Sequence, residues 1–224
     1  MIENKTTFRT PAAPSNIAEE TARILLDTSS VLVRPDDPFT FTSGRKRPVY
    51  EDCRRLISIP EDRNTLMEYA RQILEERIEG DNIDVIAGGE TAGIPYAAFL
   101  SDKMDKPMVY IRKKPKGFGA MAQIEGHFEK NTPHVVLVED LQSEGTSKEV
   151  FVNALRTAGA EIGHIFVIFH YGIFASSVQA MEDMDVTLHC LANWWDIIAL
   201  IEKENRMSKG EIDTVKAFLN NPQG

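Results

Sequence analysis

Short apolar runs alternate with segments of helical periodicity along this chain. The run Val135–Val138 is β-branched and unbroken, which is typical of a strand buried on both faces of a parallel sheet. The other expected strands are Val31–Val33, Ile83–Ala87, Met108–Ile111, His164–Phe169 and Val186–Leu191. The expected helices are 16–26, 60–78, 94–104, 146–158, one from Ile173, and one that opens at Ser208 and ends before Pro222. This alternation predicts an α/β fold with a central, mostly parallel sheet flanked by helices.

The length of the chain sets its domain organisation. With 224 residues it can bury one substantial core, so we expect a single domain over 16–224. Residues 16–58 carry short strand signals and are expected to form a small hood, while 60–224 form the core. Pro11 and Pro14 mark 1–15 as a disordered extension, followed by a helix that opens near Asn16 with Glu19 at the capping position.

Composition narrows the function classes. A net charge of −9 and a pI near 5.1 disfavour a nucleic-acid-binding protein, because binding to a phosphate backbone requires clustered positive charge. Cys53 and Cys190 are the only cysteines and lack the spacing of a metal site or a disulfide framework. No apolar stretch reaches membrane-spanning length and no secretory signal precedes the fold, so we expect no membrane contact and a cytoplasmic protein.

Chemistry concentrates in the segment 135–147, where the buried strand runs into two acids, Glu139 and Asp140, and then into a small polar loop. Open α/β sheets place their ligand sites at the carboxyl ends of their strands. Thr146 and Glu149 have the spacing of a capping box, so the amino terminus of the following helix is expected to face the loop and to attract anions. Two carboxylates repel a phosphate, so the ligand must also carry hydroxyls or a metal ion, and a ribose phosphate fits both requirements.

This segment resembles the signature of type I phosphoribosyltransferases, which bind 5-phosphoribosyl 1-pyrophosphate (PRPP). Residues 112–126 (RKKPKGFGAMAQIEG) resemble the mobile catalytic loop of the orotate phosphoribosyltransferases in that family, and residues 39–54 (FTFTSGRKRPVYEDCR) resemble their amino-terminal substrate motif. Residues 84–98 and the tail 192–197 also match, so the resemblance covers roughly 16–220. It implies the type I phosphoribosyltransferase fold and a pentosyltransferase that converts orotate and PRPP into orotidine 5′-monophosphate and pyrophosphate during de novo UMP synthesis.

The resemblance assigns residues to each part of the site. PRPP is expected to contact Thr91, Arg112, Lys113, Lys116, Glu139, Asp140, Leu141, Gln142, Ser143, Glu144, Gly145, Thr146 and Ser147. The residues expected to take part in catalysis are Arg112, Lys113, Lys116, Glu139 and Asp140. Glu139 and Asp140 are expected to hold Mg²⁺, directly or indirectly. Orotate is expected to contact Ser143, Tyr50, Arg45 and Arg54, although the aromatic residues of that motif fit core packing equally well.

The stretch 113–132 lacks periodicity, is cationic and contains glycines, as lids and binding loops do. Its lysines would neutralise the charge that builds on the departing pyrophosphate. The resemblance implies a homodimer in which this loop acts in the neighbouring active site. Gly88, Gly89 and Gly93, after the strand at 83–87, fit either a pyrophosphate-binding loop or a tight strand-to-helix turn.

Several positions depart from the usual family pattern. Phe118 stands where a loop histidine is frequent, and no arginine follows the strand near His170 and Tyr171. Glu144 puts a negative charge in the phosphate loop, so it must point away from the phosphate or weaken binding. Two rival functions remain from sequence: a phosphoribosyltransferase for another base, and a non-catalytic PRPP sensor.

Overall fold

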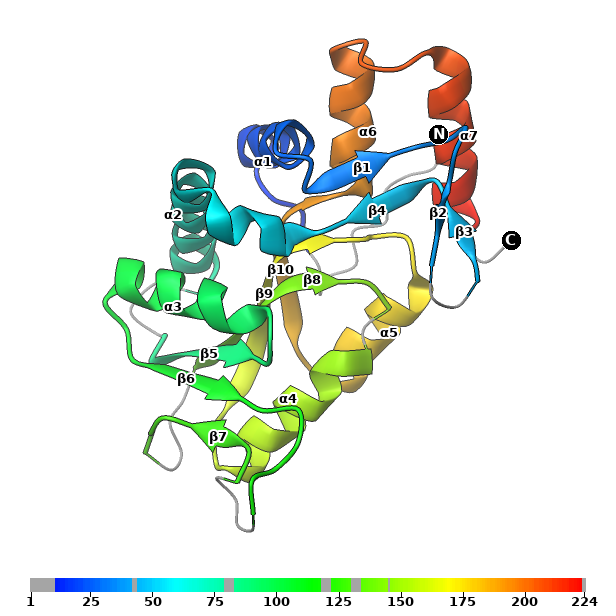
Figure 1. Ribbon diagram of the computed structural model, residues 1–224. Helices are drawn as coiled ribbons and strands as arrows, with labels where there is room; N and C mark the ends of the chain where they lie inside the picture. Colours follow the sequence, from blue (N-terminus) through cyan, green and yellow to red (C-terminus); the bar gives the residue numbers. More distant parts are fainter. Residues whose placement is uncertain are drawn as a thin grey trace.

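The computed structural model describes residues 11–41, 44–78, 83–117, 122–129, 134–144 and 146–222, with residues 146 and 147 described by their backbone only. Its centre is a six-stranded sheet in the order β10-β9-β8-β5-β6-β7 (Figure 1). These strands are β5 (Val85–Gly89), β6 (Met108–Ile111), β7 (Ile124–Glu125), β8 (Val135–Gln142), β9 (Ile162–His170) and β10 (Thr187–Asn193). Every neighbouring pair is parallel except β6 and β7. The predicted α/β fold with a mostly parallel sheet is confirmed.

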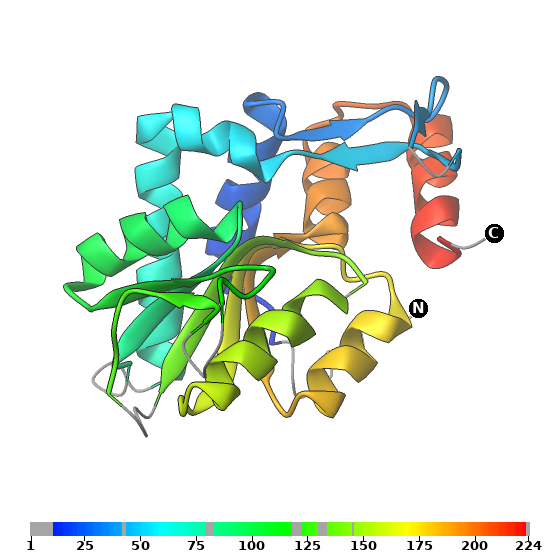
Figure 2. The same cartoon turned by 60° about the horizontal axis from the view of Figure 1, so that its bottom comes forward.

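Helices cover both faces of this sheet (Figures 1 and 2). One face carries α1 (Ser15–Asp27), α2 (Pro60–Arg77) and α3 (Gly93–Met104), and the other carries α4 (Thr146–Thr157) and α5 (Ala175–Asp183). Strand β8 supplies both apolar layers, because Val136 and Val138 pack on the first side while Val135 and Leu137 pack on the second. Burial on both faces explains why the run is apolar at every position instead of alternating.

The predicted hood region consists of short antiparallel pairs. Strand β1 (Val31–Val33) pairs with β4 (Val49–Glu51), and β2 (Phe39–Thr40) pairs with β3 (Lys46–Arg47). A 3₁₀ helix, η1 (Cys53–Ser58), leads back to α2. The buried Tyr96 of α3 donates its hydroxyl hydrogen to the carbonyl of Cys53, which ties this region to the main sheet layer. A boundary between hood and core near residue 59 stays a prediction.

Two helices end the chain. Helix α7 (Lys209–Asn220) begins after Ser208, and the capping box of Ser208 and Glu211 has both of its hydrogen bonds, as predicted. Helix α6 (Trp194–Lys203) was not predicted, because the aromatic pair at its start hid the helical period. Its cap is Asn193, which exchanges hydrogen bonds with the Asp196 backbone and side chain. Trp194 is fully buried and packs edge-on against Phe169, with the two ring centroids 5.2 Å apart, so it is a core residue.

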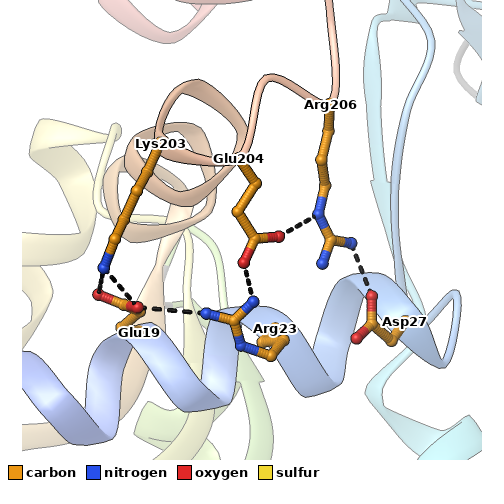
Figure 3. Close-up of polar contacts among 6 residues, drawn as sticks. All are labelled: Glu19, Arg23, Asp27, Lys203, Glu204 and Arg206. Atoms are coloured by element: carbon orange, nitrogen blue, oxygen red, sulfur yellow. Dashed lines mark hydrogen bonds and ion pairs between the residues drawn. The ribbon is translucent and has the colours of Figure 1, made fainter.

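Helix α1 differs from the prediction at its amino terminus. It begins at Ser15 with Pro14 at the capping position and without a side-chain cap, so the predicted role of Glu19 is wrong. Glu19 instead joins an ion network that connects α1 with α6 and the turn after it (Figure 3). Its members, drawn in that figure, are Glu19, Arg23, Asp27, Lys203, Glu204 and Arg206. Charges on two segments far apart in sequence therefore meet on one surface.

Part of the predicted lid at 113–132 has regular structure. Strand β7 pairs with β6, and the backbone N–H of Lys116 donates to the carbonyl of Ala122 at 2.8 Å. The segment therefore forms a hairpin where it is described, and Phe118 lies outside the described residues. Residues 1–10 of the predicted extension also lie outside the described residues. At residue 11, the carbonyl of Pro11 accepts a hydrogen bond from Arg77 of α2 at 3.1 Å. Within the described part of the chain, no helix is both long and apolar enough to cross a membrane.

Candidate active site

A cavity of about 270 Å³ opens at the carboxyl ends of β5 and β8. These two strands are neighbours in the sheet, so the loops that follow them converge at one edge. The cavity is lined by Arg54, Glu90, Thr91, Ala92, Lys113, Glu139, Asp140, Leu141, Ser143, Lys148 and Phe151. Seven residues of the predicted site come together here: Arg54, Thr91, Lys113, Glu139, Asp140, Leu141 and Ser143.

The acid pair lies inside the strand instead of beyond its end, because β8 continues to Gln142. Glu139 is 8% exposed and Asp140 is 9% exposed. Burial of the carboxyl group raises the pKa of Glu139 to about 7, and burial also raises the pKa of Asp140. The nearest cation to Asp140 is Arg54, whose Nε lies 3.8 Å from Oδ2 and whose side chain is 66% exposed. A pair this long and this open to solvent leaves the carboxylate available to a ligand.

The position of Glu139 requires glycine at the last residue of β5, Gly89, and at the first residue of α3, Gly93. A Cβ atom added at Gly89 would lie 1.9 Å from Glu139 Oε1, and one at Gly93 would lie 2.7 Å from the same atom. Gly88 instead packs against α3, where a Cβ would lie 2.9 Å from the Cβ of Ala97. Close packing of strand and helix therefore accounts for Gly88, and the carboxylate accounts for the other two. A role of this loop in pyrophosphate binding stays a prediction.

The predicted cationic residues separate in the structure. Lys113 lines the cavity, and its backbone N–H donates to Glu90 Oε2 at 2.7 Å. Arg112 Nη1 lies 3.6 Å from Glu125 Oε1 of β7, so its guanidinium is directed at the hairpin. Lys116 is exposed on the hairpin and is outside the cavity lining. Only one of the three predicted catalytic cations therefore contacts the cavity in this conformation of the chain.

The phosphate loop is partly described. Gly145 and the side chains of Thr146 and Ser147 lie outside the described residues, while α4 begins at Thr146. The Gln142 side chain is fully buried and donates to Ser177 Oγ at 3.1 Å, behind the cavity lining. Ser177 also contacts His170 Nε2 at 3.1 Å. The predicted contact of Gln142 with PRPP would therefore have to come from its backbone.

Glu144 points away from the acid pair. Its Oε1 lies 3.8 Å from Nη2 of Arg47 in β3, and its side chain lines a groove between α4 and α5. The Arg47 guanidinium also lies over the rings of Phe41 and Phe174, at 5.2 and 5.6 Å from their centroids. The extra negative charge of the loop is therefore directed at a cation of the hood instead of the expected phosphate position.

The predicted orotate residues lie on the hood side. Arg54 lines the cavity, whereas Tyr50 and Arg45 are outside its lining. Tyr50 is 38% exposed and packs against Phe39 and Phe41, with ring centroids 5.4 and 6.2 Å apart. An exposed aromatic cluster of this kind suits a planar ligand, which keeps the sequence-based role of Tyr50 open.

Two charged residues of this region were missed from sequence, Lys148 and Glu51. Lys148 lines the cavity from the first turn of α4 and is only 2% exposed. It follows the helical period of the buried Phe151, Val152 and Leu155, so a charge on the apolar stripe was the available signal. Glu51 of β4 is held near Asp140, and burial followed by the charge of Asp140 raises the pKa of Glu51 to about 8. Only the pairing of hood and sheet brings Glu51 there.

Replacing Glu51 by glutamine is expected to raise the melting temperature at pH 9 by roughly 2–5 °C and to change it little at pH 5. The folded-state pKa is raised, so folding favours the protonated acid, and this contribution is lost as pH rises from the unfolded value toward 8. Glutamine imitates the protonated acid at every pH. Thermal unfolding at both pH values measures the effect, with the exposed Glu129→Gln as control. An equal change at pH 5 and pH 9 would contradict the prediction.

The described residues contain no ready-made metal-ligand cluster. Among the residues that the structure describes, no group of three or more His, Cys, Asp or Glu side chains could hold a metal ion. The carboxylates that line the cavity, Glu139 and Asp140 among them, nevertheless offer hard oxygen donors. Such a set suits an ion like Mg²⁺ that takes one or two protein carboxylates and completes its shell with water and substrate phosphates.

Comparisons with known proteins agree with this geometry. Residues 58–195 match the model of the phosphoribosyl transferase domain family. The orotate phosphoribosyltransferase of Cereibacter sphaeroides is 45% identical over 207 residues, which cover 92% of this chain and 89% of that protein. The crystal structure of orotate phosphoribosyltransferase from Aeropyrum pernix is 28% identical with a TM-score of 0.67, covering 84% of this chain and 99% of that one. Leishmania donovani UMP synthase is 27% identical with a TM-score of 0.73, covering 90% of this chain and 42% of that one.

Proposed function

The chain belongs to the phosphoribosyltransferase family, as an orotate phosphoribosyltransferase, and from this premise we propose that its reaction takes place in the cavity between β5 and β8. The enzyme is a pentosyltransferase that moves the 5-phosphoribosyl group of PRPP to orotate and releases orotidine 5′-monophosphate and pyrophosphate, a step of pyrimidine synthesis. The observation that carries the proposed location is the acid pair, which lines the cavity beside the start of α4.

The acid pair would face the ribose. When PRPP loses pyrophosphate, C1 of the ribose becomes cation-like, and fixed carboxylates nearby stabilise that charge. Glu139 and Asp140 would also accept hydrogen bonds from the ribose hydroxyls. Ser143, Gly145, Thr146 and Ser147 would hold the 5′-phosphate at the amino terminus of α4, where unpaired N–H groups attract anions. The reaction needs no covalent nucleophile, so the role of the protein is to bind, orient and neutralise.

On the pyrophosphate side, Thr91 and Lys113 line the same cavity and would contact the leaving group. Mg²⁺, when bound, supplies positive charge to the leaving oxygens. Asp140 and Glu139 would hold the ion directly or through water, since they are the carboxylates nearest the expected ribose. Arg112 and Lys116 would reach the pyrophosphate only after a movement of the hairpin, which the glycines of the loop permit.

Orotate would enter from the hood side. It is a flat ring with a carboxylate, and it requires an aromatic or apolar face together with cationic or N–H donors. Arg54 and Ser143 both line the cavity, and Arg54 lies beside Asp140, so both would be available to the ring. Tyr50 and Arg45 would join them if the hood closed. The predicted homodimer, with the 113–132 loop acting in the neighbouring site, and the predicted cytoplasmic location stay predictions.

The direct test follows orotate consumption by its ultraviolet absorbance, with and without PRPP and Mg²⁺. Loss of absorbance only when all components are present supports the reaction and the metal together. Parallel reactions with uracil, adenine, guanine and xanthine examine the acceptor, and exclusive turnover of one of those bases would refute orotate as the substrate. Binding of PRPP without pyrophosphate release from any base would instead identify a sensor.

Replacing Lys116 by alanine is expected to lower kcat by about 100-fold with only a modest loss of PRPP affinity, because the lysine would neutralise charge that develops in the transition state. Steady-state kinetics and PRPP titration separate the two effects. Lys209, on α7 and 92% exposed, provides the control as Lys209→Ala. If Lys116→Ala keeps the full kcat, the hairpin does not act in catalysis.

A further inference from the structure

Lys148 places a positive charge beneath the acid pair. Its side chain is 3% exposed, and a buried ammonium is costly unless partners hold it. Nζ donates a hydrogen bond to the carbonyl of Leu141 at 2.6 Å and lies 3.9 Å from Oε2 of Glu139. The lysine therefore contacts both the backbone of β8 just before the phosphate loop and the first acid of the pair.

The two oxygens of Glu139 have different surroundings. Oε2 faces Lys148, while Oε1 is enclosed against Gly89 and Gly93, with no accessible surface of its own. A ligand in the cavity cannot reach Oε1 without displacing backbone. Asp140 differs, because its ion-pair partner within 4 Å among the described residues is the exposed Arg54 and not a buried lysine.

The different surroundings of Glu139 and Asp140 reduce the electrostatic repulsion that a phosphate-bearing ligand would meet at this site. Two adjacent carboxylates beside a ligand with several phosphate charges would repel it, and repulsion is strong where water is excluded. A lysine fixed against one carboxylate offsets part of this negative charge, and the other carboxylate stays directed at the ligand.

We propose that Lys148 is a positioning residue, which fixes and neutralises Glu139 so that Asp140 is the carboxylate that meets the ribose of PRPP or its Mg²⁺. The proposal rests on the proposed location of the reaction and divides the work of the acid pair. Lys148 would not touch the substrate itself. It holds Glu139 and the carbonyl of Leu141, two residues before Ser143 of the phosphate loop.

The test is a double-mutant cycle read by PRPP binding. Calorimetric titration of PRPP with Mg²⁺, without orotate, is made on the full chain and on Lys148→Met, Glu139→Gln and the double variant. Methionine keeps the length of the side chain and removes the charge. We expect Lys148→Met to bind PRPP at least tenfold more weakly, because Glu139 and the Leu141 carbonyl then lose the group that holds them in place. In the Glu139→Gln background, the same lysine substitution is expected to change PRPP affinity by less than about threefold, because the group through which the lysine acts is already altered.

Thermal unfolding of the four proteins adds a readout of folding, and the double variant is expected to be more stable than Lys148→Met. If Lys148→Met does not fold, Glu139→Gln still decides, since it keeps the lysine. Lys103→Met on α3, away from the cavity, is the matched control.

Two results would overturn the proposal: unchanged PRPP affinity in Lys148→Met, or a loss in Glu139→Gln as large as that caused by Asp140→Asn. Absence of PRPP binding to the unchanged chain would instead overturn the proposed location together with this inference, so the two failures are distinguishable.

Discussion

Asp140→Asn is expected to lower kcat/KM for PRPP by about a thousandfold, which corresponds to about 4 kcal/mol of lost transition-state stabilisation. Asparagine keeps the shape of the side chain and removes the negative charge that would face the cation-like ribose. The carboxylate is buried to 9% exposure at the cavity wall, where charge is screened less than on the surface. Most of the loss should therefore appear in kcat.

The measurement is orotate consumption at varied PRPP and Mg²⁺. The control is Asp213→Asn on α7, whose side chain is 62% exposed and pairs only loosely with Lys209 at 3.8 Å. The competing explanation is that Asp140 serves as a structural partner of Arg54. In that case Asp140→Asn would lower the melting temperature and leave kcat unchanged, and Arg54→Gln would lower it by a similar amount.

Gly89→Ala is expected to reduce activity by about a thousandfold and to destabilise the fold by roughly 1–3 kcal/mol. The added Cβ would lie 1.9 Å from Glu139 Oε1, far inside contact distance. The carboxylate cannot retreat easily, because the backbone of Gly93 is so near that a Cβ built there would lie 2.7 Å from the same oxygen, and Lys148 Nζ lies 3.9 Å from the other oxygen. Either the acid pair turns out of place or the strand end shifts, and both changes distort the cavity.

A double variant separates these effects. Gly89→Ala combined with Glu139→Ala removes the carboxylate that collides and leaves the close approach to Phe151 Cε2, at 2.8 Å, so stability should recover in part while activity stays low. Kinetics and denaturant unfolding measure the two properties. Gly210→Ala is the control: a Cβ at Gly210 of α7 meets nothing within 4 Å, and alanine there should leave activity unchanged and stabilise the helix slightly. Full activity in Gly89→Ala would show that Glu139 can move freely and that its position is not critical.

Periodicity was sufficient for the frame of the fold. A strand buried on both faces must be apolar where it crosses the core, so the unbroken apolar run Val135–Val138 of β8 predicted a parallel sheet from sequence alone. The capping box at Ser208 likewise marked the start of α7, because its hydrogen bonds join residues three apart. Both patterns involve residues that are close together along the chain, so they can be recognised without the tertiary structure.

Boundaries and charges were less predictable. The acids Glu139 and Asp140 suggested the end of a strand. Strand β8 nevertheless continues to Gln142, because its pairing with β9 extends to Gln142, whereas its pairing with β5 ends at Val138. Burial, which raises the pKa of both acids, follows from helices packed around them. A stretch without periodicity at 113–132 proved to contain the antiparallel strand β7, since pairing with β6 stabilises a segment that has little preference of its own.

The sequence by itself determined the α/β alternation, the acid pair and the resemblance that named its chemistry, because each depends on residues that are neighbours along the chain. Only the tertiary structure decided which charges share the cavity: it brought Arg54, Lys113 and Lys148 to the acid pair, held Glu51 beside Asp140, and directed Arg112 and Glu144 elsewhere. These charged residues come from the hood, from the ends of two strands and from a helix, which are distant along the chain. The energy of a buried charge depends on the groups around it in space, and that environment exists only once the distant segments have packed.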